Sequence, residues 1–306
     1  YKIKGLWIDG IQRKFSIRNI IFPLKLFISI IHSFFIIINF RPKCVVGTGG
    51  FASGPLLFAA ALLRIPTIIH EQNSFPGLTN KLLGKLVDKI CVSYDDMEKY
   101  LPSKKIVKTG NPIRKVLKEN VDKKVAQEAF NLSNKKLTIL IVGGSLGAEP
   151  INKLISKKIQ YFSNYQLIWQ TGKSNYQKYN KLSHDFDNVS VFDFIDRMDL
   201  AYSIADIVVS RAGAIAITEI CFLKKASILI PSPYVSENHQ MKNAKTLAKN
   251  GACLIVEEKE LQKHFLSTLE QLSNNEVYRN QIATNAKKIS IDNASMKIIN
   301  LLNNIF

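Results

Sequence analysis

Short apolar segments recur along this chain, and each is followed by a loop of small residues and then by a segment with helical periodicity. The apolar segments lie at 44–47, 66–73, 89–93, 105–113, 137–145, 165–172, 189–195, 205–213, 226–233 and 252–257. Strands separated by helices form βαβ units, in which neighbouring strands run parallel. The pattern therefore predicts an α/β fold with two successive parallel sheets, one in each half of the chain.

The 306 residues are enough for two domains of ordinary size. We expect residues 1–113 to form the first domain and residues 137–306, which end in helical periodicity, to form the second. The polar, Lys-rich stretch 114–136 is predicted to be a helix and connector. In open parallel sheets, ligands bind at the carboxyl ends of the strands, where loops lead into helix N-termini. Candidate site residues are therefore sought at those positions.

The charge of the chain points to an anionic partner. Lys and Arg number 42 and Asp and Glu 24, which gives a net charge of +18. Nucleic acid, acidic lipid and phosphorylated small molecules would all suit such a charge. The four cysteines are far apart and form no CxxC pair. They argue against a disulfide scaffold or a structural zinc site and are typical of buried thiols in a reducing compartment.

The most apolar segment of the chain, residues 20–40, lies among basic residues. Residues 1–43 contain one acid, Asp9, and eight basic residues, namely Lys2, Lys4, Arg13, Lys14, Arg18, Lys25, Arg41 and Lys43. A membrane-spanning helix needs about 20 predominantly apolar residues, whereas Pro23 and three polar residues interrupt this segment. We therefore predict that it lies on an anionic membrane surface, with the flanking cations near the lipid, and does not cross the bilayer. The alternative is a buried core helix with a solvated charged rim.

Two Gly-rich turns follow predicted strands, at 45–54 (VVGTGGFASG) and 141–147 (IVGGSLG). Glycines let the backbone come close to a ligand, and free amides at a helix start suit a phosphate. Neither turn has the dinucleotide spacing GxGxxG or the P-loop spacing. One turn alone is as well explained by local structure, and the pair does not distinguish a nicotinamide-dependent dehydrogenase from a glycosyltransferase.

The stretch 209–219 (VSRAGAIAITE) is more informative, because Glu219 falls early in a helix that follows a strand. A carboxylate there can accept the hydroxyls of a ribose while the helix N-terminus holds a phosphate. The alternative is that Glu219 only complements the helix dipole. The segment 231–240 (PSPYVSENHQ) places a polar cluster before an amphipathic helix, or forms a solvated loop.

His70 and Glu71 end another predicted strand. They are candidates for acid–base catalysis, although a histidine beside an apolar strand is commonly a hydrogen-bonded structural residue. The sequence contains neither an HExxH motif nor spaced metal ligands, so no metal is expected.

Together these segments resemble the MurG family, the peptidoglycan N-acetylglucosaminyltransferases that convert lipid I to lipid II. The matching motifs, in the family's order, are TGGFASGP, HEQNSFPGLTNK, TGNPIR, GGSLGAEPIN, FIDRM, ADIVVSRAGAIAITE and ENHQMKNA. The resemblance implies the GT-B fold, in which two Rossmann-like domains face a cleft. It also implies a peripheral enzyme on the cytoplasmic face of the inner membrane. The N-terminal domain would meet the anionic membrane surface and lipid I, and the C-terminal domain would hold UDP-GlcNAc. Other cell-wall synthesis proteins are possible partners, and nucleic acid is not expected.

The resemblance also implies roles for individual residues. The donor side would consist of Asn111, Gly143, Gly144, Ser145, Thr171, Ile195, Ala214, Ile215, Ala216, Ile217, Thr218, Glu219 and Gln240. The acceptor side would consist of Gly47, Thr48, Gly49, Gly50, Gln72 and Asn73. Among them, Glu219 would bind the ribose hydroxyls, Gln240 the sugar hydroxyls and the Ile195 backbone the uracil. UDP-GlcNAc is a substrate, and no cofactor is expected.

Two departures from the family pattern bear on activity. Glu149 stands where the family usually has arginine, so a basic donor contact is lost or moved. The family's first strand and its TGGH loop, with the proposed catalytic base, have no counterpart after Tyr1, and we expect residues to be missing before it. The first hypothesis is an inverting glycosyltransferase, in which the C4 hydroxyl of the muramoyl sugar attacks the anomeric carbon and UDP leaves. The alternative is a catalytically impaired binding module of the same pathway at the membrane surface.

Overall fold

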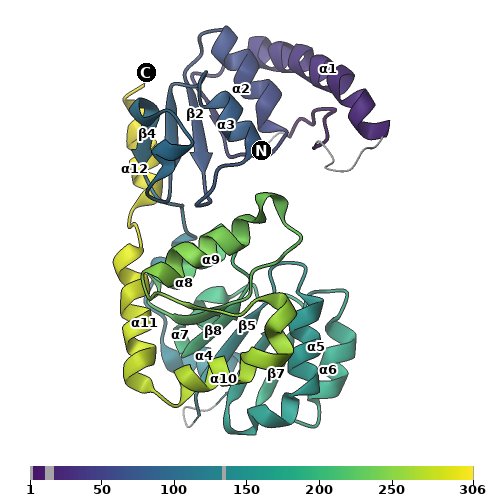
Figure 1. The fold of residues 1–306 in the computed structure, drawn as a ribbon, viewed down its shortest axis with the longest axis vertical. Coiled ribbons are helices and arrows are strands. Elements are labelled where there is room, and N and C mark those ends of the chain that lie inside the picture. Colours follow the sequence, from purple (N-terminus) through teal and green to yellow (C-terminus); the bar gives the residue numbers. More distant parts are fainter. Residues whose placement is uncertain (1–2, 11–16, 133–135, 306) are drawn as a thin grey trace. The chain divides into compact units, whose positions relative to one another are not determined.

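The computed structural model describes residues 3–10, 17–132 and 136–305, and these divide into two compact units (Figure 1). The first unit is formed within Tyr1–Asn111 together with Asn293–Phe306, and the second is Pro112–Asp292. Each unit is built around its own parallel sheet. The predicted α/β class with two parallel sheets is thereby confirmed.

In the first unit, four parallel strands are ordered β1-β2-β3-β4. The strands are β1 (Val45–Gly47), β2 (Thr67–Glu71), β3 (Lys89–Val92) and β4 (Ile106–Lys108). Every residue of β2 is buried, as expected for an inner strand of a parallel sheet with both faces covered. The helices are α1 (Ile17–Phe40), α2 (Ser53–Leu62), α3 (Leu78–Leu83) and α12 (Ala294–Asn303).

Helix α1 is attached to the first unit along one face. It packs against α2 (Figure 1). Ile37 joins the core that surrounds β2. Ser29 is buried and its hydroxyl donates to the carbonyl of Trp7 at 2.9 Å. The other face carries exposed apolar side chains, and only 17% of the most apolar 18-residue window of the whole helix is buried. Among the described residues, one helical segment, Asn19–Phe40, is long and apolar enough to cross a membrane by length and composition alone.

In the second unit, six parallel strands are ordered β10-β9-β8-β5-β6-β7. The strands are β5 (Thr138–Val142), β6 (Gln166–Gln170), β7 (Val189–Phe192), β8 (Ile207–Ser210), β9 (Ala226–Leu229) and β10 (Leu254–Ile255). The helices are α4 (Lys123–Ala129), α5 (Glu149–Lys157), α6 (Tyr176–Ser183), α7 (Met198–Ile204), α8 (Ala214–Phe222), α9 (His239–Lys249), α10 (Leu261–Ser273) and α11 (Glu276–Ile289). This is the strand order of a Rossmann sheet, and the order reverses between β5 and β8.

The units differ from the predicted domain boundaries at two places. The stretch expected to be a connector, 114–136, belongs to the second unit, because α4 packs on α7 and Phe130 contacts Phe192 edge to face. The last helix, α12, belongs to the first unit. Helical periodicity predicts a helix and an apolar face, but not which sheet covers that face.

Candidate functional site

The candidate site of the second unit lies where its strand order reverses. β5 and β8 are adjacent, with Ile141 opposite Val209 and Val142 opposite Ser210. The loops that follow these two strands therefore leave the same edge of the sheet side by side. Most of the predicted donor residues lie here, with Gly143 to Ser145 in the loop after β5 and Ala214 to Glu219 in α8, the helix that follows the β8 loop. A switch point of this kind is where open α/β sheets bind ligands.

The loop after β5 needs glycine for two different reasons. At Gly147, with φ +77°, a Cβ would lie 1.9 Å from the carbonyl oxygen of Thr171, so only glycine allows the two loops to touch. At Gly144, with φ +90°, a Cβ would meet no heavy atom of the described residues within 4 Å, so this part of the loop borders open space. The Gln170 amide donates to the Gly144 carbonyl at 2.8 Å and holds the loop in place.

The side chains of Thr171 and Ile195, two predicted donor residues, are buried. The Thr171 hydroxyl donates to the Phe192 carbonyl at 3.1 Å, and its own carbonyl accepts from Asn152 at 2.9 Å. These contacts give Thr171 a structural part in joining neighbouring strand ends. The contact predicted for Ile195 uses its backbone, so burial of its side chain is compatible with that prediction.

Helix α8 presents an uncapped N-terminus at the switch point. It begins at Ala214 after Gly213, which has no side chain to cap it, and its first turn contains the small residues Ala214 and Ala216. Free amides and the dipole at such a helix start favour an anion. Arg211, the cation just before this helix, pairs with Glu258 and also donates to the Ile230 carbonyl at 3.2 Å. The charge of Arg211 is therefore already matched within the second unit.

Glu219 is buried, and its carboxylate is bound by an arginine. Arg114 donates through Nε to Oε1 and through Nη2 to Oε2, both at 2.9 Å, and the Tyr202 hydroxyl lies 3.5 Å from Oε2. Burial opposes the charge on Arg114, but the hydrogen bond and charge of Glu219 outweigh it and raise the pKa of Arg114. Glu219 is the sixth residue of α8, beyond the first turn in which the helix dipole acts, so dipole complementation does not explain it.

Sequence reasoning missed Arg114 and Tyr202 as partners of Glu219. Arg114 lies in the TGNPIR motif, which was the available signal for it. Tyr202 lies on α7 within an otherwise ordinary apolar pattern. Arg114 is 105 residues from Glu219 in the chain, so the pairing becomes visible only once the fold is known.

Gln240, the last predicted donor residue, lies in the first turn of α9. Its side-chain oxygen accepts from the Ser232 backbone amide at 2.9 Å, which fixes the loop between β9 and α9. The buried Asn243 amide donates to the Ala212 carbonyl at 3.3 Å and ties α9 to the loop after β8. The β8 and β9 loops are therefore connected by side-chain hydrogen bonds.

Glu149, which stands at the family's arginine position, lies in the first turn of α5 with two cations beside it. Its Oε1 accepts from the Tyr179 hydroxyl at 3.1 Å and lies 3.7 Å from the Nζ atoms of Lys153 and Lys178. Its Oε2 is buried and has no hydrogen-bond partner among the described residues. The acid at this position is thus accompanied by two lysines.

In the first unit, the predicted acceptor residues lie at the ends of β1 and β2. The Gln72 amide donates to the Thr48 carbonyl at 3.1 Å and joins the two loops. Asn111, predicted on the donor side, also belongs to this unit, where its amide donates to the Gln72 carbonyl at 3.1 Å. The structure therefore brings Thr48, Gln72 and Asn111 together at one edge of the first sheet.

Both candidate acid–base residues are held by structural hydrogen bonds. Glu71 is buried and accepts from the backbone amides of Asn73 and Gly77, at 3.0 and 3.1 Å, and from the Asn80 side chain at 2.7 Å. His70 is buried as well, with Nε2 3.0 Å from the Gly110 carbonyl and Nδ1 3.2 Å from the Gln72 amide nitrogen. These contacts support the structural alternative for both residues.

We expect His70 to make the first unit sensitive to acid. Burial lowers the pKa of His70, although the Gly110 hydrogen bond and Glu71 partly oppose this. The partners assign the neutral form with the proton on Nε2, because Nδ1 faces an amide donor. The unfolded chain, with a pKa near 6.5, then takes up a proton before the folded chain, and stability is lost as pH falls below that value.

Hydrogen exchange at β2, followed from about pH 7 to about pH 5.5, measures this effect. The intrinsic exchange rate falls at the lower pH, so the readout is the protection factor, in which that rate is divided out. The β2 protection factors should fall at the lower pH in the parent chain, and this fall should be smaller in His70→Gln. An equal fall in both chains would assign the acid sensitivity to other groups.

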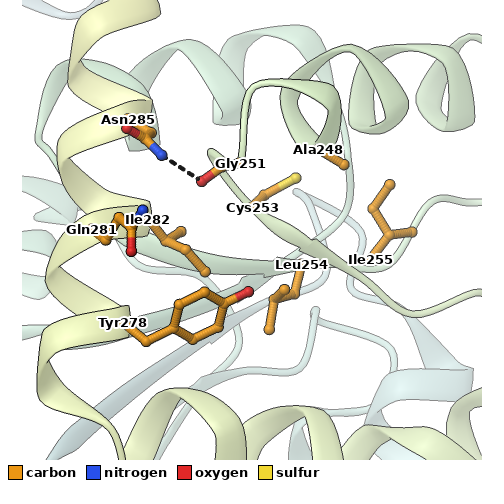
Figure 2. Close-up of a pocket in the computed structure, with 9 residues that line it drawn as sticks. All are labelled: Ala248, Gly251, Cys253, Leu254, Ile255, Tyr278, Gln281, Ile282 and Asn285. Carbon is orange, nitrogen blue, oxygen red and sulfur yellow. Dashed lines mark hydrogen bonds between the residues drawn. The ribbon is translucent and has the colours of Figure 1, made fainter.

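A separate hollow of about 310 Å³ lies in the second unit between α9, β10 and α11. Figure 2 shows Tyr278, Gln281 and Asn285 on one side of it, with the Asn285 amide donating to the Gly251 carbonyl at 3.2 Å. It contains none of the predicted site residues. Among the described residues, His, Cys, Asp and Glu side chains form no group of three that could hold a metal ion.

Comparison with known proteins identifies the family of this chain. Residues 138–299 match the glycosyltransferase family 28 C-terminal domain, and residues 1–92 match the N-terminal domain of that family. The chain is 45% identical to the UDP-N-acetylglucosamine–N-acetylmuramyl-(pentapeptide) pyrophosphoryl-undecaprenol N-acetylglucosamine transferase of Flavobacterium psychrophilum, over 98% of this chain and 82% of that one. It is also 45% identical to the protein of that name from Christiangramia forsetii, over 99% and 84%.

Solved structures agree. The chain is similar to the crystal structure of Acinetobacter baumannii MurG, with 28% identity, a TM-score of 0.75, and coverage of 92% of this chain and 79% of that one. A UDP-GlcNAc 2-epimerase from Neisseria meningitidis, 18% identical with a TM-score of 0.68 over 96% of this chain and 84% of that one, shares the fold. The predicted family and GT-B fold are confirmed, and the chain belongs to the MurG glycosyltransferases of family 28.

Proposed function

We propose that this chain transfers N-acetylglucosamine from UDP-GlcNAc to the muramoyl sugar of lipid I, which gives lipid II in peptidoglycan synthesis. The observation that carries the proposal is the 45% identity, over 98% of the chain, to a relative with this activity in its name. The strand order of the second unit supports it, because its switch point is a ready site for a nucleotide. The alternative of a nicotinamide-dependent dehydrogenase rested on the two Gly-rich turns alone, and no other observation supports it.

The donor would bind at the loops after β5 and β8. The free amides at the start of α8 would hold the diphosphate and stabilise the charge that develops on UDP as it leaves. The buried carboxylate of Glu219 would accept from the ribose hydroxyls. Gln240, in the first turn of α9, would reach the sugar. Because the Arg211 charge is matched by Glu258, the helix start and not this arginine is the anion site.

The acceptor would bind at the first unit, near the loops joined by the Gln72–Thr48 hydrogen bond. We assign no catalytic base there, because the contacts of His70 and Glu71 occupy both side chains.

A transfer assay tests the proposal. The chain is incubated with UDP-GlcNAc labelled in the sugar and a short-chain lipid I analogue in detergent, and labelled lipid II and free UDP are measured. We expect both products in equal amounts. Tight UDP-GlcNAc binding without labelled lipid would favour the alternative, a binding module. UDP release without labelled lipid would indicate hydrolysis and contradict the transferase.

We further propose that α1 holds the chain on an anionic membrane surface as a peripheral protein, at the cytoplasmic face where UDP-GlcNAc is available. The exposed face of α1 carries a continuous apolar row, here called the exposed stripe: Ile20, Leu24, Phe27, Ile31, Phe35 and Ile38. Spacings of three and four residues place these side chains on one side of the helix. With its other face packed on α2, the helix is suited to lie in an interface.

The cations near α1 differ in whether their charge is free to attract anionic lipid. Lys25, expected near the lipid, is mostly buried and forms an ion pair with Asp9, so its charge is already matched. Arg41 and Lys43, just after the helix, are exposed. Lys2, Arg13 and Lys14 lie outside the described residues, as does the side chain of Arg18. Of the three cations expected near the lipid, Lys25, Arg41 and Lys43, we retain Arg41 and Lys43 and leave out Lys25, which is paired with Asp9.

A further inference from the structure

We propose that Arg114 is a positioning residue for the nucleotide sugar and acts through Glu219. It touches neither ribose nor sugar; it holds the carboxylate in the one orientation that leaves an acceptor site for the ribose. The inference rests on the proposed role of Glu219 and adds a second residue, from the segment before η3 (Lys115–Lys118), to the nucleotide site.

The geometry of the pair defines what it can do. Arg114 uses Nε and Nη2, which bind the two carboxylate oxygens side by side at 2.9 Å. A bidentate pair of this kind fixes the plane of the carboxylate as well as its position. An ionised carboxylate offers about four acceptor sites. Arg114 takes two and the Tyr202 hydroxyl approaches a third at Oε2, so Oε1 keeps a site for a ribose hydroxyl.

The residues behind the pair keep it in place. Arg114 has an extended backbone and is followed by η3, whose Leu117 is buried and which packs on α7. Tyr202 comes from the same helix and is buried, and burial raises the pKa of Tyr202, so its hydroxyl keeps its proton and can donate. Helix α7 therefore supports both partners of the Glu219 carboxylate.

The exposure of the two partners shows that the pair opens to solvent on one side. The Glu219 side chain is 5% exposed, whereas the Arg114 side chain is 44% exposed. A buried carboxylate without a partner would be strongly destabilised, so something must hold it whether or not nucleotide is bound. Arg114 does so from the open side, so the carboxylate has a hydrogen-bonding partner before the ribose arrives.

The test compares UDP with 2′-deoxy-UDP in calorimetric titrations of the full chain. If Glu219 accepts from the 2′-hydroxyl, the parent chain should prefer UDP by about tenfold or more, since a hydrogen bond to a charged group contributes that much. We expect Arg114→Lys to lose most of this preference, and Arg114→Gln all of it. The affinity for 2′-deoxy-UDP should change by less than about threefold, because the helix start that binds diphosphate is untouched.

A merely structural salt bridge would behave differently, since loosening the second unit would weaken both nucleotides equally. Thermal melting confirms that each variant is folded at the titration temperature. Arg279→Lys is the matched control, because Arg279 binds backbone carbonyls at the end of α10 and should keep the full preference for UDP. Preference retained in both Arg114 variants would overturn the inference. Preference retained in Glu219→Gln would overturn the ribose role of Glu219 itself, and the transfer assay would still test the activity independently.

Discussion

Replacing Glu219 with glutamine is expected to lower the affinity for UDP-GlcNAc about 10- to 100-fold. The Glu219 side chain is 5% exposed, so its hydrogen bonds to a ribose would form away from competing water. Hydrogen bonds to charged groups contribute about 1.5–3 kcal/mol, and each 1.4 kcal/mol is a factor of ten in affinity. Glutamine keeps the shape of the side chain but loses the charge and one acceptor oxygen.

The Glu219→Gln chain should stay folded, which makes the affinity change interpretable. Arg114 loses its ionic partner, but its guanidinium is partly exposed and water can solvate it. Calorimetry with UDP and with UDP-GlcNAc should show similar losses for both, because both contain the ribose. Unchanged UDP affinity in Glu219→Gln would remove this residue from the site.

Gln240→Ala is the complementary variant. If Gln240 reaches only the sugar, the affinity for UDP-GlcNAc should fall while that for UDP stays within about threefold, since one neutral hydrogen bond contributes about 1 kcal/mol. The structure adds a condition, because Gln240 also accepts from the Ser232 amide and fixes the β9 loop. Equal losses for UDP and UDP-GlcNAc would show that the loop, and not a sugar contact, is what the substitution disturbs.

The fold of the second unit was predictable because its sequence is locally consistent. Each apolar segment from β5 to β10 is short, bounded by small residues and followed by helical periodicity. A parallel sheet with helices on its faces buries the apolar residues of such segments. The position of the site followed from the same reasoning. Loops at the carboxyl ends of β5 and β8 are neighbours in any doubly wound sheet whose order reverses there.

Long-range pairings were not predictable from these patterns. The Arg114–Glu219 pair joins residues far apart in the chain, which local sequence patterns do not connect. The count of basic residues near α1 included Lys25 among the cations at the membrane, but Lys25 is paired with Asp9. The same limit explains α12, whose periodicity indicates a helix but not that it joins the first unit. For α1, composition predicted an apolar segment at a membrane surface, and only packing on α2 showed which face of the helix is left exposed.

The second large expected effect is the loss of vesicle binding when acidic residues replace apolar residues of the exposed stripe. In Phe27→Glu/Phe35→Glu, two side chains that are 62% and 61% exposed become acidic. Transferring a large apolar side chain out of water contributes about 1.5–3 kcal/mol, so the double substitution removes several kcal/mol of membrane affinity. Repulsion from anionic lipid adds to this loss. Sedimentation with vesicles rich in acidic lipid should show binding of the parent chain that this variant lacks.

Salt and a matched control separate the two parts of the interaction. Arg41→Ser/Lys43→Ser should weaken binding at low salt and matter little at high salt, because each cation near the surface contributes about 1 kcal/mol that salt screens. The apolar part should persist at high salt. Val277→Glu places one acid at an exposed apolar residue on α11 of the second unit and should leave vesicle binding unchanged. Should the parent chain ignore acidic vesicles, or the Phe27→Glu/Phe35→Glu chain still sediment with them, the exposed stripe would have no role at the membrane.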